Sequence, residues 1–221
     1  MMLGSESVWE RRETTDAILS DQAYNSVIGG VLLWGFGINY LTVTMVPVEA
    51  ILAIPYWMLI VGYFISAIAG TIIFQKSDNH AISFLGYNLI VVPIGIILTP
   101  ILNAIDPTII VDALMITGGF TGLMMFLGVT YPKFFLSLGR VLAFSLIGVI
   151  LLEIGLMFTM GHQPEIIDWI VAGLFCMYIG YDWARANKIP KTMDNAVDSA
   201  ASLYLDIINL FIRILSILSR R

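Results

Sequence analysis

Charged residues are scarce in this chain. Asp, Glu, Lys and Arg make up 12% of its 221 residues, whereas 58% are hydrophobic. A soluble domain of this size would carry about 25% charged residues. The single cysteine, Cys176, excludes an intramolecular disulfide. Polytopic membrane protein is the class that fits this composition.

Catalytic and targeting motifs are also missing. The chain contains neither a His-Glu-x-x-His zinc motif nor a Gly-x-Ser-x-Gly elbow, so we expect no enzyme of those classes. Its first 25 residues are polar and lack the apolar core of a secretory signal. Insertion into a membrane is therefore expected to depend on the spans themselves.

Seven apolar runs are long enough to cross about 30 Å of hydrocarbon, which takes roughly 20 residues. They cover residues 27–46, 51–74, 81–105, 111–130, 134–160, 166–184 and 197–218. We predict an all-α polytopic membrane protein with a polar N-terminal segment, 1–26, and a transmembrane domain, 27–218. Pro93 and Pro100 in the third run predict a kinked or broken helix there.

Lys and Arg are distributed on one side of the predicted membrane domain. The N-terminal segment and every second loop hold Arg11, Arg12, Lys76, Lys133, Arg140, Arg185, Lys188 and Lys191. The opposite loops and nearby span ends hold Glu49, Asp106, Asp112, Glu153, Glu165 and Asp168. The positive-inside rule makes the N-terminus cytoplasmic. The short loops and the lack of an organelle-retention signal favour a prokaryotic plasma membrane.

One face of the last predicted helix is polar. Its members recur every three or four residues, so they share one side of the helix: Ser199, Ser202, Asp206, Asn209, Arg213, Ser216 and Arg220. Such a face inside a membrane must contact water, an ion or polar groups of neighbouring helices. Arg213, Arg220 and Arg221 also depart from the one-sided charge pattern, because they follow at the far end of this helix. Either this helix spans the membrane and ends outside, or it dips in and returns; its apolar length and its polar face favour a full span.

Two acids fall at overlapping depths in the cytoplasmic half, Asp182 on the sixth span and Asp206 on the last. Two neighbouring carboxyl groups at low dielectric cannot both ionise cheaply, so we expect such a pair to share a proton and to titrate as a unit. Its oxygens would also suit a hard cation such as Ca²⁺. The alternative is that each aspartate separately caps a helix or bonds a backbone group, and the spacing leaves both interpretations open.

Two further patterns concern packing. Arg213 falls at the depth of Glu153 on the fifth span, which predicts a buried ion pair between them. The favoured interpretation is a static pair that fixes the register of the two helices. Gly118 and Gly122 form a small-xxx-small pair, which predicts close helix packing in the fourth span.

Two segments carry a family resemblance. Residues 177–185 (MYIGYDWAR) and 202–215 (SLYLDIINLFIRIL) resemble the last two helices of the Bax inhibitor family of membrane proteins. The resemblance implies six helices around a central C-terminal one, and a pH-sensitive calcium leak gated by an aspartate pair that maps onto Asp182 and Asp206. It also implies a basic residue that contacts the pair from the second span, for which Lys76 is the candidate. Two acids that the family carries have no counterpart, in residues 51–74 and around Phe134.

The first functional hypothesis is this leak. Asp182 and Asp206 would be the pH sensor and calcium ligands, and the supporting residues would be Ser202, Asn209, Arg213, Glu153 and Lys76. The expected partners are the lipid bilayer, Ca²⁺ and protons, with no resident cofactor and no nucleic acid.

Two other hypotheses remain. The chain could be a regulator that binds another membrane protein, such as a quality-control protease or a cell-death factor, on family analogy alone. It could also be an intramembrane aspartyl protease with Asp182 and Asp206 as its dyad. The glycine-flanked second aspartate typical of those proteases is absent, because Asp206 follows Leu203, Tyr204 and Leu205.

Overall fold

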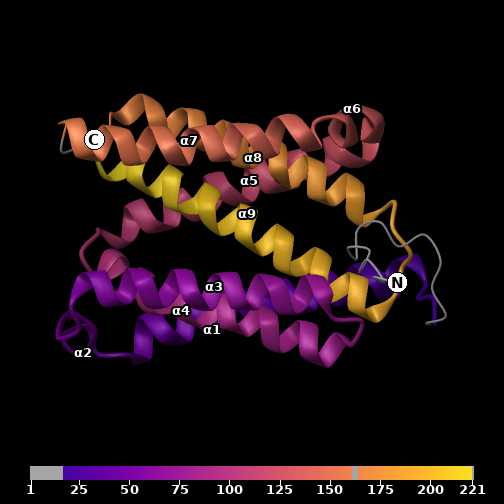
Figure 1. Cartoon of the computed structure of the whole chain (residues 1–221), viewed down its shortest axis with the longest axis horizontal. Helices are drawn as coiled ribbons and strands as arrows, with labels where there is room; N and C mark the ends of the chain where they lie inside the picture. The colour runs from indigo at the N-terminus through magenta and orange to yellow at the C-terminus, as the bar shows by residue number, and fades with distance from the viewer. Residues whose placement is uncertain (1–16, 161–163, 221) are drawn as a thin grey trace, which may run out of the picture. The chain divides into compact units, whose positions relative to one another are not determined.

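The computed structural model describes residues 17–160 and 164–220, which form helices, turns and short connections without a strand. The helices of this part of the chain (Figure 1) are α1 (Asp21–Met45), α2 (Val48–Leu52), α3 (Tyr56–Lys76), α4 (His80–Asn103), α5 (Pro107–Thr130), α6 (Pro132–Ser137), α7 (Gly139–Met160), α8 (Glu165–Ala186) and α9 (Met193–Ser219). Seven of them, all except α2 and α6, are long and apolar enough to cross a membrane. The predicted all-α fold with seven spans is confirmed.

The predicted N-terminal segment, 1–26, lies mostly outside the described residues. Its described part already enters a helix, because α1 begins at Asp21, with the Ser20 side chain accepting the N–H of Ala23 as an N-cap. The arrangement of six helices around the last one stays a prediction.

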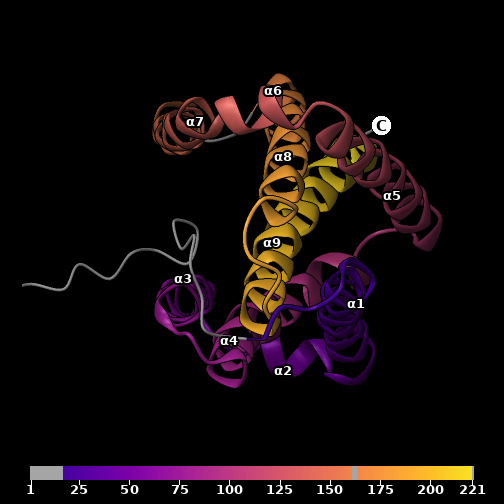
Figure 2. The ribbon, with the colours of Figure 1, turned by 90° about the vertical axis from the view of Figure 1, so that its right-hand side faces the viewer.

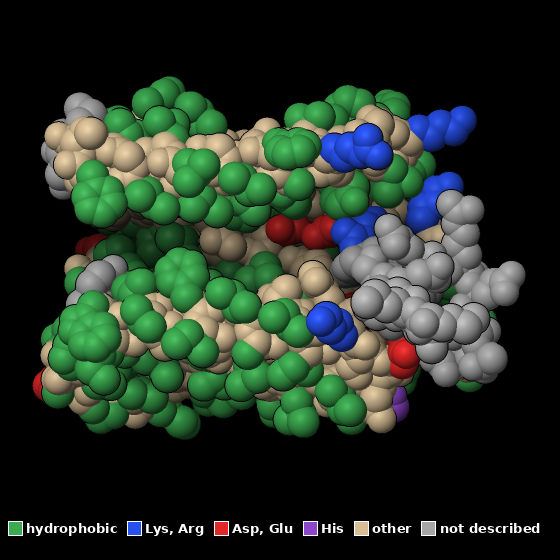
Figure 3. All heavy atoms as spheres, viewed as in Figure 1, with side chains coloured by type: hydrophobic (Ala, Val, Ile, Leu, Met, Phe, Trp, Pro, Cys, Tyr) green, Lys and Arg blue, Asp and Glu red, His purple; other side chains and the backbone are tan. Residues whose placement is uncertain are grey.

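The chain divides into two compact units. The first contains α1 to α4 and the start of α9, up to Ser202, and the second contains α5 to α8 and the rest of α9, from Leu203. Hydrophobic side chains (green in Figure 3) gather over both units on the face that this view shows. Large apolar residues exposed in this number are expected where lipid is the solvent.

Helix α4 is the centre of the first unit, between α1 and α3 (Figure 2). Glycine allows its closest contact: a Cβ atom added to Gly86 would lie 2.7 Å from the Gly70 carbonyl oxygen on α3. Small residues let membrane helices approach backbone to backbone in this way. On the α1 side, the Asn39 amide donates to the Val91 carbonyl at 3.1 Å.

Both prolines of the third predicted span lie inside α4, which runs unbroken from His80 to Asn103. The predicted break therefore does not occur. Pro93 has no N–H, so it leaves the Leu89 carbonyl without its intrahelical donor. The Ser66 hydroxyl on α3 donates to that carbonyl at 2.5 Å and replaces the missing bond.

Two predicted spans are divided where the sequence showed one apolar run. The run 51–74 begins in the last residues of α2 and continues as α3, because Pro55 disfavours a helical conformation in the preceding residue and occupies the N-cap position of α3. The run 134–160 separates into α6 and α7 at Leu138. Each division leaves a short helix at a membrane end beside a full span.

In the second unit, α8 packs against α5, α6 and α7. A Cβ atom at Gly128 on α5 would lie 2.6 Å from the Gly180 carbonyl oxygen on α8, so these glycines mark the close approach. The packing predicted at Gly118 and Gly122 is wrong for the described chain: both are exposed, and an added Cβ would meet nothing within 4 Å. Those glycines lie on another face of α5.

Candidate functional site

Asp182 on α8 and Asp206 on α9 meet inside the second unit. They are 9% and 5% exposed, and their side chains are hydrogen-bonded to each other. Asp206 Oδ2 is inaccessible to solvent and receives no N–H or hydroxyl donor from the described residues. Because an ionised carboxylate can only accept, a hydrogen bond between two carboxyl groups requires a proton on one of them. A contact of this kind would therefore need one shared proton.

Arg185 supplies the positive charge beside this pair. Its Nη1 lies 3.4 Å from Asp182 Oδ1, one turn further along α8, and its guanidinium lies over the Tyr181 ring at 5.6 Å from the centroid. An ion pair with Asp182 favours the negative charge on that residue. With one proton on the pair, the two carboxyl groups and the guanidinium would carry no net charge.

The joint between α6 and α7 covers this end of α8. The Phe135 ring rests on Gly180, where a Cβ atom would lie 2.6 Å from Phe135 Cδ1. At Gly139, a Cβ atom would lie 2.8 Å from the Tyr181 hydroxyl. The two glycines therefore bring aromatic rings against the backbone directly beside Asp182.

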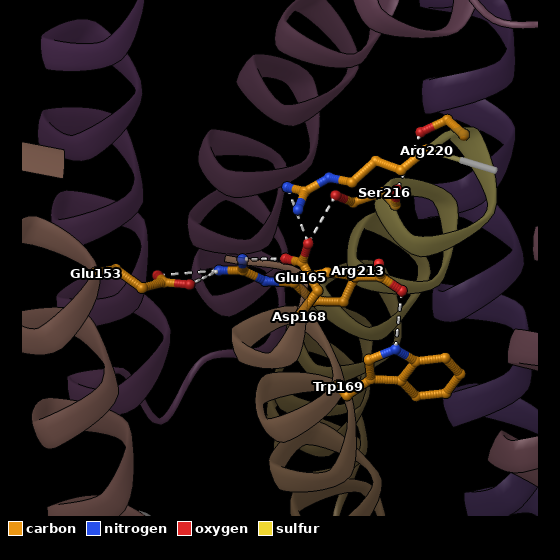
Figure 4. A network of polar contacts seen from close by, with 8 residues as sticks. Glu153, Glu165, Asp168, Trp169, Arg213, Ser216 and Arg220 are labelled. Atoms are coloured by element: carbon orange, nitrogen blue, oxygen red, sulfur yellow. Dashed lines mark hydrogen bonds and ion pairs between the residues drawn. The ribbon is translucent and has the colours of Figure 1, made fainter. Parts of the chain in front are cut away.

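A second polar cluster joins α7, α8 and α9 around Asp168, which is 2% exposed on its side chain (Figure 4). Arg213 donates through Nη1 to Asp168 Oδ1 at 2.9 Å and through Nη2 to Glu153 Oε2 at 3.0 Å. Asp168 Oδ2 accepts from the Ser216 hydroxyl at 2.9 Å and pairs with Arg220 Nη2 at 3.1 Å. The predicted Arg213–Glu153 contact is thus present as part of a larger network.

This network accounts for two arginines that departed from the one-sided charge pattern. Arg213 and Arg220 each pair with an acid, so their charges are compensated where they lie. Sequence reasoning placed Asp168 only among the charges of the opposite side and missed its central role. A signal was available in the sequence: two arginines at membrane depth need acidic partners.

A family sequence model described as "Inhibitor of apoptosis-promoting Bax1" matches residues 18–221. The chain belongs to the Bax inhibitor family. Bax inhibitor 1 of Schizosaccharomyces pombe is 32% identical over 170 residues, which are 73% of this chain and 61% of the yeast protein. Membership of this family and the seven apolar helices make the chain an integral membrane protein.

Bacterial relatives match a shorter part of this Bax inhibitor family chain. A Helicobacter pylori protein is 30% identical over 132 residues, and a Campylobacter jejuni protein is 32% identical over 131 residues; both are described as uncharacterized. Each match covers 56% of this chain and 55% of the relative. The chain thus spans about half the length of these curated relatives.

The other predicted supporting residues of this Bax inhibitor family site are less closely tied to the aspartate pair. Asn209 donates its amide to the Leu205 carbonyl of its own helix at 2.7 Å. Lys76, at the end of α3, and Ser202 belong to the first unit. Their proposed contributions to an ion path stay predictions.

Sequence reasoning also missed a set of buried polar residues where α9 begins, because the predicted span started at 197. Asp194 accepts from the Ser83 hydroxyl at 2.8 Å, and the Thr192 hydroxyl caps the helix by accepting the Asn195 N–H at 3.1 Å. The Tyr24 hydroxyl lies 3.0 Å from Ser199 Oγ. These contacts hold the first turns of α9 inside the first unit, in a part of the Bax inhibitor family chain that we treat as structural.

No group of three or more His, Cys, Asp or Glu side chains within residues 17–160 and 164–220 has an arrangement that could hold a metal ion. Asp182 and Asp206 would therefore supply two carboxyl groups to a calcium ion, which takes six to eight oxygen ligands. Water and backbone carbonyls would complete the shell.

Proposed function

We propose that this Bax inhibitor family protein is a pH-sensitive calcium leak of a prokaryotic plasma membrane, with its N-terminus on the cytoplasmic side. The observation that carries the proposal is the buried hydrogen bond between the side chains of Asp182 and Asp206. The two residues come from different helices, so the bond joins α8 to α9 and depends on a proton. A contact of this chemistry is a latch that hydrogen-ion concentration controls.

The charge balance of the site determines whether a rise in pH opens or closes the latch. With one proton, Asp182, Asp206 and Arg185 carry no net charge, and the helices stay together. When the proton leaves, two carboxylates face one guanidinium in a site of low dielectric, and their repulsion and hydration separate α8 from α9. Proton loss becomes more favourable as pH rises, so the leak should increase with pH.

The Asp168 cluster determines which part of α9 moves. Asp168 and Asp182 are fourteen residues apart on α8, which is roughly 21 Å along a helix. The contacts of Asp168 with Arg213 are between opposite charges and need no shared proton. Loss of the shared proton would therefore release the part of α9 around Asp206. Arg213 would keep the part of α9 around its own position bound to α8 and α7.

Calcium flux into proteoliposomes of the purified protein tests this function. We expect flux above that of empty liposomes, rising between acidic and mildly alkaline pH. Asp206→Asn should remove most of that pH dependence, because an amide replaces the titrating group without a change of size. Asp112→Asn, at an exposed acid on α5, is the matched control and should behave as the unaltered protein does.

A flux equal to that of empty liposomes at every pH would exclude the leak. The alternative, a regulator that binds another membrane protein, would then gain support if a stable partner were recovered from detergent extracts. That partner should also be retained by the Asp182→Asn, Asp206→Asn double variant, because binding would not depend on the latch.

A further inference from the structure

The short helix α6, Pro132–Ser137, has two faces of different chemistry. Phe135 is 3% exposed, whereas Tyr131 and Phe134 are 58% and 54% exposed. Lys133 on the helix and Arg140 just after it are exposed as well. An apolar ring thus points into the protein, and two aromatic and two basic side chains remain outside.

The outward residues have the composition of a headgroup-binding surface. The chain passes from the end of α5 at Thr130 to the start of α7 at Gly139, so α6 lies between two spans at one membrane end. Figure 3 shows positive side chains (blue) at the end of the second unit where α6 lies. Aromatic side chains favour the membrane–water interface, and Lys or Arg there attract anionic phospholipids.

The inward residues contact the helix that carries the latch. Phe135 rests on Gly180, and Gly139 lies against the ring of Tyr181. Both contacts are within two residues of Asp182, whose side chain is bonded to Asp206. A displacement of α6 would therefore remove the packing that holds this turn of α8 in place.

We propose that the α6 face, defined as Tyr131, Lys133, Phe134 and Arg140, is a docking surface for anionic phospholipid headgroups, and that lipid bound there holds the aspartate latch closed. The basic pair complements the headgroup phosphate, and the aromatic pair enters the interface beside it. Docking keeps α6 seated, so Phe135 stays on Gly180. The effect on the latch rests on the proposed calcium leak, whereas the docking surface does not.

Lipid retention tests the docking surface directly. The full chain is purified from vesicles of phosphatidylcholine with phosphatidylglycerol at about 3:1, and the phosphatidylglycerol retained is counted by native mass spectrometry. The Lys133→Gln, Arg140→Gln variant should retain it on the order of fivefold more weakly for each charge removed. The matched control is Lys76→Gln, Lys188→Gln, which removes the same charge from two exposed residues of the first unit. Equal retention by both double variants would overturn the docking surface.

Calcium flux tests the effect on the latch. At one pH, the unaltered protein should leak less in vesicles that contain phosphatidylglycerol than in phosphatidylcholine alone. The Lys133→Gln, Arg140→Gln variant should lose this difference, and Phe135→Leu should lose it while still retaining the lipid. A lipid effect on flux that survives both variants would overturn the coupling. Absence of flux in every vesicle would instead remove the proposed leak and leave the retention result to decide the docking surface.

Discussion

The guanidinium of Arg213 donates to the carboxylate of Asp168 at 2.9 Å, and this contact ties the last helix to α8 through opposite charges. Fourteen residues further along α8, Asp182 is bonded to the same last helix through another carboxyl group. One antiparallel helix pair is thus joined by two contacts of opposite character. The first is independent of a shared proton, and the second requires one.

Removal of Arg213 should destabilise the second unit. Arg213→Gln leaves Asp168 buried with one arginine fewer, and the loss of one partner from a buried ion pair costs about 3 kcal/mol or more. The denaturant midpoint of the purified protein in mixed micelles measures the change. Arg213→Lys should recover part of the loss, and Lys188→Gln, at an exposed lysine, should leave the midpoint unchanged. A midpoint unaltered by Arg213→Gln would mean that the network does not hold the helices.

Gly180 and Gly118 should respond differently to alanine. A Cβ atom at Gly180 meets the Phe135 ring, so Gly180→Ala should cost about 1–3 kcal/mol through overpacking. The same change at Gly118 meets nothing within 4 Å and should be neutral or slightly stabilising. Thermal unfolding in detergent compares the two variants. Phe135→Leu should relieve part of the effect at Gly180, and equal shifts at both glycines would contradict the packing.

Ser66 should matter only because α4 contains Pro93. Ser66→Ala removes the donor to the Leu89 carbonyl, at a cost of about 1 kcal/mol. In a Pro93→Ala background the alanine N–H can bond that carbonyl, so the further change of Ser66 should have little effect. Four unfolding midpoints complete this double-mutant cycle. Additive effects of the two substitutions would show that the serine acts independently of the proline.

The sequence was enough to predict the spans and the aspartate pair, because hydrophobic length and polar spacing are local properties. Asp182 and Asp206 were found from their depth and from the family motif. The division at Leu138 was not predicted, because the apolar run continues through it without a break in composition. The role of Asp168 was missed because an acid near a loop is expected to be solvated, and only the tertiary fold places Arg213 beside it.

Arg185 should set the pH at which the proposed leak opens. Its contact with Asp182 favours the state in which both carboxyl groups are ionised. Tyr178 and Tyr181 are the other titratable groups beside the site. Without the guanidinium, ionisation becomes less favourable, so Arg185→Gln should move the pH of half-maximal calcium flux upward, by about one unit for each 1.4 kcal/mol lost. Flux measured across pH in proteoliposomes gives this midpoint.

Arg185→Lys is the control that separates charge from shape. It keeps a cation near Asp182, so its midpoint should lie between those of the unaltered protein and Arg185→Gln. The stacking on Tyr181 and the fixed guanidinium geometry are lost, which should prevent full recovery. A downward shift in Arg185→Gln would contradict the charge balance of the latch, because removal of a neighbouring cation cannot favour the loss of a proton from a carboxyl pair.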